Sequence, residues 1–455
     1  MGATAPAGPE GRSELRLGPV RAAAQGALRH VPANGRWLAL IVVIGLSLRL
    51  VWVVHVEPAP VGDALWYMIV AQNLTNGDGF AADHSDPFRS EPPAELQATA
   101  FFPPAYPLAL AAVWKLMGVS ITSAKVLNAL LGALTIPFVY GIGRRIFDRR
   151  VGLSAAGLFA LLPNAIVWLP GLLSEALFTF LFAAALWLLV AGRSSAGAVA
   201  FGLLAGIAML ARGPGMVLLP LAALIWLLRD GRSSALPRVA QAVLVSALVV
   251  GPWTVRNWVE LGSPILVASN TGVNLRVGHA PEASGTWIAL NDPVDGVPGW
   301  EVHSGTDIEV RSYRVYTRRA VEYALTHPGR EVTLSASKVR HLYRSDGEML
   351  PALTVWGAPP LRPRGLEAVL GPLLDASWYG LLGGVVGLAP LWLRKRPEHA
   401  LLVGAVVLWT AFHVVFFGHP RFHLPLLPLF CVVAAAGLWT AIAALRPWWG
   451  RLRVH

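Results

Sequence analysis

Long apolar runs dominate the pattern of the chain, and short polar segments separate most of them. Many of the runs reach about 20 residues, the length that an α-helix needs to cross the hydrocarbon core of a bilayer. The pattern predicts an all-α, polytopic membrane protein with about ten transmembrane helices. The predicted spans are Trp37–Val56, Ser123–Gly143, Val151–Leu169, Glu175–Ala191, Gly197–Leu210, Met216–Leu228, Val239–Trp258, Ala376–Leu393, Ala400–Phe417 and Leu424–Leu445.

Two of these spans are short, and the sequence Arg212-Gly213-Pro214-Gly215 lies between them. Glycine and proline interrupt helices, so this cluster predicts a hairpin inside or near the membrane surface. A further apolar run, Pro104–Val119, is shorter than a span and contains Lys115. Whether this run crosses the membrane decides the side on which every later loop lies.

The basic residues settle that question, because short cytoplasmic loops carry an excess of Lys and Arg. With Pro104–Val119 on the outer surface as a juxtamembrane helix, the short basic loops fall on the cytoplasmic side. With the run spanning, most of them fall outside. We therefore predict a disordered cytoplasmic tail over 1–36 and a catalytic transmembrane module over 37–258, with a first outer loop over 57–122. A large extracytoplasmic loop with amphipathic surface helices follows over 259–375. The chain then continues with C-terminal transmembrane helices over 376–445 and a cytoplasmic tail over 446–455.

Composition supports the membrane assignment and excludes nucleic acid as a partner. Of the 455 residues, 55% are hydrophobic and 14% are charged, whereas a soluble domain carries about 25% charged residues. The net charge is +11, but the arginines cluster at the ends of apolar runs and are not interleaved with aromatic residues. The one cysteine, Cys431, excludes an intramolecular disulfide.

Polar residues gather at the predicted outer ends of the spans. Ionisable groups at membrane depth are functional candidates, because placing them in lipid is costly. The predicted topology brings five such segments to the outer face: Gly62-Asp63-Ala64-Leu65-Trp66-Tyr67, Ser174-Glu175, Arg212-Gly213-Pro214, Pro252-Trp253-Thr254-Val255-Arg256-Asn257-Trp258 and His419-Pro420-Arg421-Phe422-His423-Leu424-Pro425.

These residue types suit the transfer of a sugar from a polyprenyl-phosphate carrier to an acceptor outside the cytoplasm. Asp63 can take the proton of an acceptor hydroxyl as general base, and Glu175 can orient Asp63 or a sugar hydroxyl. Arg421, with Arg256 or Arg212, can hold the phosphate oxygens. Fixed cations also stabilise the charge that the leaving phosphate gains.

At these residues the chain resembles the GT-C superfamily of glycosyltransferases, in particular its family 39 branch. That branch includes protein O-mannosyltransferases, the aminoarabinose transferases of lipid A and the Rgt-type galacturonosyltransferases. The resemblance covers roughly Arg49 to Asn274 and the Arg421 segment. It rests on Asp63 with Tyr67 and, in this order, on Phe102-Pro103-Pro104-Ala105-Tyr106-Pro107, Arg144-Arg145-Ile146-Phe147, Ser174-Glu175, Pro252-Trp253-Thr254-Val255-Arg256-Asn257 and Ser269-Asn270-Thr271-Gly272-Val273-Asn274-Leu275.

The resemblance implies a GT-C fold and inverting transfer from a polyprenyl-phosphate sugar to a cell-envelope glycan, lipid or protein at the plasma membrane. It implies that Asp63 is the base. We expect no cofactor and no metal, because His419 and His423 have no carboxylate cluster beside them in the sequence. The residues expected to bind substrate are Arg421, Arg256, Arg212, Tyr67, Asn257 and Tyr106.

Two positions depart from the pattern of the family. Several relatives carry paired acids in the first loop, whereas Ala64 follows Asp63 here. Some relatives carry a basic residue before the proline of the second motif, whereas Phe101 and Phe102 stand here. These departures affect the contacts expected with the phosphate, the sugar or the acceptor.

Each candidate also has a structural alternative. Asp63 and Glu175 are both able to cap the helix that follows. Arg421 is able to extend toward lipid headgroups. Arg256 and Arg212 are able to anchor the ends of their spans.

The rival function is that of a membrane transporter or lipid flippase. Such proteins carry polar residues at the bilayer midplane and broken helices in matched halves, whereas these spans are nearly free of charge in the middle and no internal repeat is visible. A structural scaffold leaves the gathering of Asp63, Glu175 and Arg421 on one face unexplained. Arg49 lies about two turns inside the first span. Its side chain can either reach the interface or pair with Asp63 or a phosphate, and the sequence favours neither.

Overall fold

The computed structural model describes residues 33–56, 60, 62–82, 96–192, 194–290, 292–296, 305–350, 365–392 and 396–452. Most of the predicted 1–36 tail therefore lies outside the described residues. In the described ranges the only strands are β1 (Ala81–Ala82) and β2 (Gln97–Ala98), which form one antiparallel pair. The predicted all-α class is confirmed.

Helices make up the rest of the regular structure. The α-helices and 3-10 helices (η) of the described ranges are, in chain order, α2 (Ala33–His55), α3 (Asp63–Asn76), α4 (Ala105–Met117), α5 (Ile121–Ile146), α6 (Arg149–Leu161), η1 (Pro163–Ala165), η2 (Leu169–Gly171), α7 (Glu175–Ala191), α8 (Ser195–Ala211), η3 (Gly213–Val217), α9 (Leu218–Leu261), α10 (Asn270–Gly278), α11 (Thr306–Thr326), α12 (Pro328–Leu342), η4 (Asp346–Met349), α14 (Leu366–Trp392), α15 (Pro397–Val415), η5 (Pro420–Leu426) and α16 (Leu427–Leu452).

Six helical segments of the described ranges are long and apolar enough to cross a membrane, and a seventh forms if α6 is taken with η1 and η2 as one bent span. The helices α4, α7 and α8 are apolar but shorter. Large apolar side chains such as Val43, Leu248 and Val259 stay more than half exposed on the bundle surface. Apolar surface of this extent needs a lipid environment. The chain is therefore a multi-pass membrane protein, and the number of about ten spans remains a prediction.

The helices α8 and α9 pack closely because small residues line their contact. A Cβ atom at Gly202 of α8 would lie 2.7 Å from the carbonyl oxygen of Ala242 in α9. The hydroxyl of Ser246 donates to the carbonyl oxygen of Gly202 at 2.8 Å. Small residues let membrane helices approach to this distance. The predicted hairpin between these two helices corresponds to η3.

Several boundaries differ from those predicted. The span predicted at Met216–Leu228 begins in η3 and continues into α9, which also contains the span predicted at Val239–Trp258. The helix α9 changes direction at Gly231, where φ is 72°. A left-handed φ is open to glycine at no steric cost. The helix α14 begins at Leu366, ahead of the predicted span, and α16 continues to Leu452 through the predicted start of the cytoplasmic tail.

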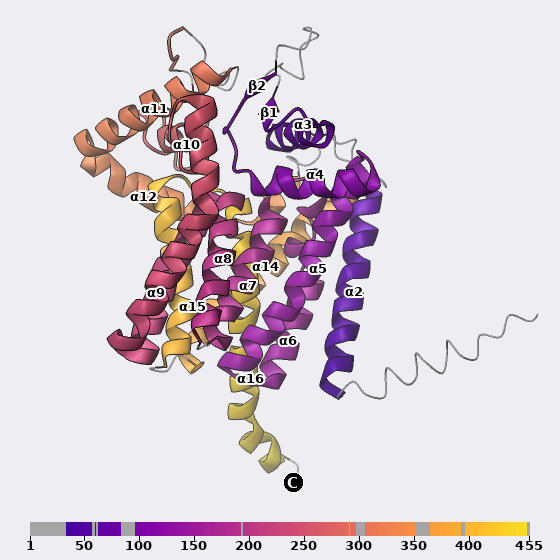
Figure 1. The fold of residues 1–455 in the computed structure, drawn as a ribbon. Helices are drawn as coiled ribbons and strands as arrows, with labels where there is room; N and C mark the ends of the chain where they lie inside the picture. Colours follow the sequence, from indigo (N-terminus) through magenta and orange to yellow (C-terminus); the bar gives the residue numbers. More distant parts are fainter. Residues whose placement is uncertain are drawn as a thin grey trace, which may run out of the picture.

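One end of the bundle carries α3, α4, the two strands, α10 and α11, and we call it the loop end (Figure 1). The helix α4 lies across the ends of the bundle helices rather than beside them, which agrees with the surface helix predicted at Pro104–Val119. The chain that follows α4 is held against it by the indole N–H of Trp114, which donates to the carbonyl oxygen of Ser120 at 3.0 Å.

The two predicted outer loops are joined by a buried acid. Oε1 of Glu309 in α11 accepts hydrogen bonds from the amide of Ala100 at 2.9 Å and from the hydroxyl of Ser269 at 2.7 Å, and Oε2 accepts from the hydroxyl of Thr99 at 2.7 Å. Burial raises the pKa of Glu309. Glu309 thus connects Thr99 and Ala100 of the first loop to Ser269 of the second.

The orientation of the bundle is testable by cysteine labelling, because the only native cysteine, Cys431, is buried. We expect Asp78→Cys and Glu282→Cys, both at exposed positions, to react with an impermeant maleimide added outside the cell. Cysteines at either terminus should react only after permeabilisation, because the short basic loops then lie inside. Labelling of an intact cell at the C-terminus would contradict the ten-span topology.

Candidate active site

Four charged side chains from distant parts of the chain meet at the loop end. Nη2 of Arg421 donates to Oδ2 of Asp63 at 2.8 Å, and Nε of Arg421 lies 3.4 Å from Oε1 of Glu175. Nη1 of Arg212 lies 2.6 Å from the same oxygen of Glu175. We call Asp63, Arg421, Glu175 and Arg212 the charged quartet. Acids and guanidinium groups alternate along it, so their formal charges cancel.

The Asp63 end of the quartet is partly exposed to solvent, whereas Glu175 is buried. The side chain of Asp63 is 31% exposed and that of Arg421 is 24% exposed, whereas that of Glu175 is only 5% exposed. The Glu175–Arg212 contact is an ion pair without an aligned hydrogen bond, and Nη1 of Arg212 donates instead to the hydroxyl of Ser174 at 3.1 Å. An incoming hydroxyl group can therefore reach Asp63 more readily than Glu175.

Helix N-termini surround the quartet. Asp63 is the first residue of α3 and Glu175 the first residue of α7, while Arg421 is the second residue of η5. The chain enters α3 through Gly62, whose φ is 54°, and approaches α7 through Leu172, whose φ is 51°. The free N–H groups of helix N-termini carry partial positive charge, which stabilises the carboxylates and favours an anionic ligand.

Helix capping does not explain the position of Asp63. The cap residue of α3 is Gly62, and no side chain makes a cap hydrogen bond there. Oδ2 of Asp63 accepts its hydrogen bond from Arg421, whose residue number is higher by 358. The carboxylate is thus directed toward the quartet, beyond its own helix.

Aromatic rings line the quartet. The guanidinium carbons of Arg212 and Arg421 each lie 5.3 Å from the centre of the Phe422 ring. The hydroxyl of Tyr67 lies 3.3 Å from that of Ser174. Burial and the nearby Asp63 raise the pKa of Tyr67, so its hydroxyl stays protonated. Sequence reasoning did not single out Phe422 by itself, although its place beside Arg421 is a usable signal.

Arg256 and Asn257 do not join the quartet. Nη1 of Arg256 donates to the carbonyl oxygen of Thr99 and Nη2 to that of Phe80, both at 2.7 Å. Nδ2 of Asn257 donates to the carbonyl oxygen of Ile265 at 2.8 Å. Both side chains thus connect the C-terminal end of α9 to neighbouring loops, which is the structural alternative noted for this motif.

Tyr106 lies behind Tyr67, inside the protein. Its side chain is fully buried, its hydroxyl donates to Oδ1 of Asn128 at 3.2 Å, and its ring meets that of Tyr67 edge to face at 5.2 Å. Tyr106 therefore supports Tyr67 and does not contact the quartet.

Arg49 is held inside the bundle, away from Asp63. Nη1 donates to the carbonyl oxygens of Gly45 and Ala160 at 2.9 and 3.0 Å, and Nη2 donates to that of Phe159 at 3.1 Å. The guanidinium thus joins α2 to α6. It neither reaches the interface nor pairs with an acid of the quartet.

The histidines near Arg421 are occupied by other contacts. Burial and the charge of Arg421 lower the pKa of His419 to about 3, so this imidazole is neutral. Both ring nitrogens of His423 already face protein oxygen atoms. Across the residues that the structure describes, no group of three or more His, Cys, Asp or Glu side chains is arranged to hold a metal ion.

Residues 102–255 match the family model for dolichyl-phosphate-mannose-protein mannosyltransferases. This segment contains Glu175 and Arg212 but neither Asp63 nor Arg421. No curated protein matches the chain. The family match therefore covers most of the predicted 37–258 module, from residue 102 onward, and the other half of the quartet lies outside it.

Solved structures share the fold of the chain. The oligosaccharyltransferase AglB from Archaeoglobus fulgidus, in complex with an inhibitory peptide and a dolichol-phosphate, has a TM-score of 0.53 at 16% identity, over 93% of this chain and 52% of AglB. The apo form of the same enzyme has a TM-score of 0.52 over the same shares. The chain thus spans about half the length of these oligosaccharyltransferases.

A more remote similarity links the chain to ArnT from Cupriavidus metallidurans bound to undecaprenyl phosphate. The identity is 16%, the TM-score is 0.42, and the match covers 91% of this chain and 80% of ArnT. That score is too low for a structural argument. The family model and the AglB fold together confirm the resemblance to the GT-C superfamily, and the fold of the chain is a GT-C fold.

Proposed function

We propose that the protein is an inverting glycosyltransferase that moves a sugar from a polyprenyl-phosphate carrier to an extracytoplasmic acceptor. The observation that carries the proposal is the charged quartet at the loop end of a membrane-embedded GT-C fold. It combines a partly exposed carboxylate with guanidinium groups, which are the two groups that this reaction needs. The family match to dolichyl-phosphate-dependent enzymes supports a lipid-phosphate donor.

Asp63 acts as the general base. As the acceptor oxygen attacks the anomeric carbon, its proton passes to a carboxylate oxygen of Asp63, which is the most exposed acid of the quartet. The bond between the anomeric carbon and the phosphate oxygen breaks at the same time. The phosphate leaves with the bonding electron pair, and the configuration at the anomeric carbon is inverted.

Arg421 connects the phosphate site to the base. In this structure Nη2 of Arg421 pairs with Asp63, and Nε faces Glu175. A phosphate that binds the guanidinium fork takes over these N–H groups, because charge-assisted bidentate contacts are the strongest that Arg makes. The Asp63 oxygen then becomes free to accept a hydrogen bond from the acceptor hydroxyl.

Arg212 and Glu175 keep the other charged groups of the site in position. Both guanidinium groups form ion pairs with the same oxygen of Glu175, so this carboxylate holds the two arginines near each other. The four formal charges cancel, and the N-termini of α3 and α7 stabilise the extra negative charge of the phosphate. The hydroxyl of Ser174 accepts from Arg212 and lies 3.3 Å from the hydroxyl of Tyr67, which connects Tyr67 to the quartet.

Purified protein tests the proposal directly. Polyprenyl-phosphate sugars with several different sugar groups are incubated with the protein and with envelope glycans, lipids or peptides as acceptors. We expect release of polyprenyl phosphate that depends on both protein and acceptor, and a product of inverted anomeric configuration. A retained configuration contradicts direct displacement. Movement of the lipid across a vesicle bilayer without loss of its sugar favours the flippase alternative.

A further inference from the structure

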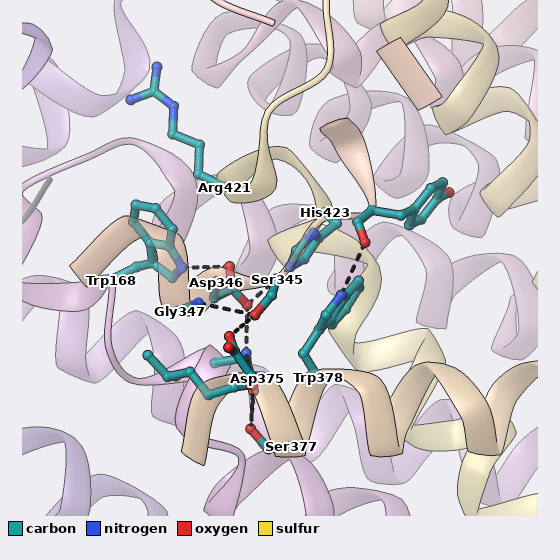
Figure 2. A network of polar contacts seen from close by, with 12 residues as sticks. Trp168, Ser345, Asp346, Gly347, Asp375, Ser377, Trp378, Arg421 and His423 are labelled. Carbon is teal, nitrogen blue, oxygen red and sulfur yellow. Dashed lines mark hydrogen bonds and ion pairs between the residues drawn. The ribbon is translucent and has the colours of Figure 1, made fainter. Parts of the chain in front are cut away.

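A second polar network, fully buried, lies behind Arg421 and has no part in the proposed chemistry. Asp346, the first residue of η4, is at its centre. Its Oδ2 accepts from Nδ2 of Asn164 at 2.6 Å and lies 3.1 Å from Nε2 of His423, and its Oδ1 accepts from the indole of Trp168 at 3.2 Å (Figure 2). The side chains of Asp346 and His423 are both 0% exposed. A carboxylate placed so far from water needs all of these partners.

The network and the charged quartet share η5. Figure 2 shows Arg421 pointing away from the network and His423, two residues later, pointing into it. In a 3-10 helix with three residues per turn, residues two apart lie on different faces. Any rotation of η5 that moves His423 therefore also moves Arg421, in a different direction.

Hydrogen bonding holds the imidazole of His423 at both nitrogens. Nδ1 lies 2.9 Å from the carbonyl oxygen of Leu342, and Nε2 lies 3.1 Å from the carboxylate of Asp346. These two oxygen atoms belong to α12 and η4, so the imidazole of His423 connects η5 to both elements.

Stacking holds the imidazole across one face. The ring of Trp378 stacks on that of His423, with the ring centres 3.8 Å apart and an angle of 8° between the planes. The imidazole is thus fixed along two edges and one face.

The other partners of Asp346 lead to Glu175. Asn164 and Trp168 lie in the segment of η1 and η2, a few residues before Ser174 and Glu175. One carboxylate therefore binds both the helix that carries Arg421 and the segment that precedes Glu175. Those are the two residues whose side chains meet at 3.4 Å in the quartet.

From this arrangement we propose that Asp346 and His423 form a positioning pair that sets the orientation of η5 and hence the direction of Arg421. The pair does not touch the reacting atoms. Asp346 follows α12, so the large loop after α9 supplies a residue that shapes the active site. The inference rests on the proposed function only for its kinetic test.

The kinetic test is a double-mutant cycle between Asp346→Asn and Arg421→Lys. If the pair acts through Arg421, Asp346→Asn lowers transfer about fivefold with Arg421 in place, and changes it less than about twofold in the Arg421→Lys background. Equal losses in both backgrounds would overturn the proposal, because a general structural defect adds independently. His423→Gln replaces Asp346→Asn if that variant does not accumulate in the membrane.

A readout without catalysis separates this inference from the proposed function. Phenylglyoxal modifies accessible guanidinium groups, and mass spectrometry of the purified protein measures the modification of Arg421. We expect Asp346→Asn and His423→Gln to raise the modification rate of Arg421 above that of the wild type. An unchanged rate would overturn the positioning role whether or not the protein transfers a sugar.

Tyr343→Phe is the matched control. It removes a hydroxyl that is hydrogen-bonded to Thr410 of α15 at 2.7 Å, and it keeps the carbonyl oxygen of Tyr343 that accepts from the indole of Trp378. We expect Tyr343→Phe to leave both the modification of Arg421 and the transfer rate near those of the wild type. A change as large as that of Asp346→Asn would show that any lost buried hydrogen bond has this effect, and would also overturn the proposal.

Discussion

Asp63→Asn is expected to abolish sugar transfer, with a loss of about a thousandfold or more, while the protein accumulates normally in the membrane. Asparagine keeps the size of the side chain, but its amide cannot accept the proton of an acceptor hydroxyl. The stability of the fold should change little, because the Asp63–Arg421 pair is partly exposed and such pairs contribute little. The measurement is transfer from a purified polyprenyl-phosphate sugar at matched protein abundance.

Asp307→Asn supplies the control for this experiment. Asp307 is an exposed acid in the first turn of α11, also at the loop end, and has no contact with the quartet. We expect its variant to keep wild-type transfer. If Asp63→Asn turned over at a near wild-type rate, Asp63 would not be the base, and the mechanism would need another proton acceptor.

Arg421→Lys is expected to insert and fold normally but to lose at least about tenfold in turnover, a barrier rise of roughly 1.4 kcal/mol. Arg421 faces Asp63 through Nη2 and Glu175 through Nε, so two nitrogen atoms of the guanidinium are used at once. The single ammonium group of lysine lacks this fork. A side chain that only reaches toward lipid headgroups would tolerate the exchange, because both residues place a cation at the interface.

The control for Arg421→Lys is Arg318→Lys. The side chain of Arg318 is 70% exposed on α11, with a 3.8 Å contact to Glu322. We expect this variant to be indistinguishable from the wild type. Equal transfer by the Arg421→Lys and wild-type proteins would remove Arg421 from the phosphate site and would favour the transporter alternative.

Arg212 and Arg256 illustrate how far the sequence constrains a site residue. In the sequence both lie at the predicted outer end of a span, Arg212 directly before Gly213 and Arg256 four residues after Pro252, so both are equally good candidates for a phosphate contact. In the structure Arg212 meets Glu175, whereas Arg256 donates to two backbone carbonyl groups of the first outer loop. A sequence pattern determines the depth of such a side chain in the membrane, but the rotation of its helix determines what it contacts.

The amino-acid sequence by itself determined that the protein is an all-α membrane protein and that its candidate site lies at the ends of the spans. Apolar runs of membrane length allow only helices, because lipid offers no partners for backbone hydrogen bonds. Charges are costly within lipid, so Asp63, Glu175, Arg212 and Arg421 were all expected at the ends of spans. The order of their motifs along the chain was sufficient for the resemblance to the GT-C superfamily, which the fold confirmed.

Only the tertiary structure decided which of these residues meet. Asp63 and Arg421 are 358 positions apart, and His423 and Asp346 are 77 apart. No local rule of helix spacing or capping relates residues at such separations. Their contacts depend on how η5 is rotated against α3, α7 and η4, and that rotation is set by the packing of the whole bundle. For the same reason no sequence pattern indicated the partners of His423, whose ring lies between the carbonyl oxygen of Leu342 and the carboxylate of Asp346 in the fold.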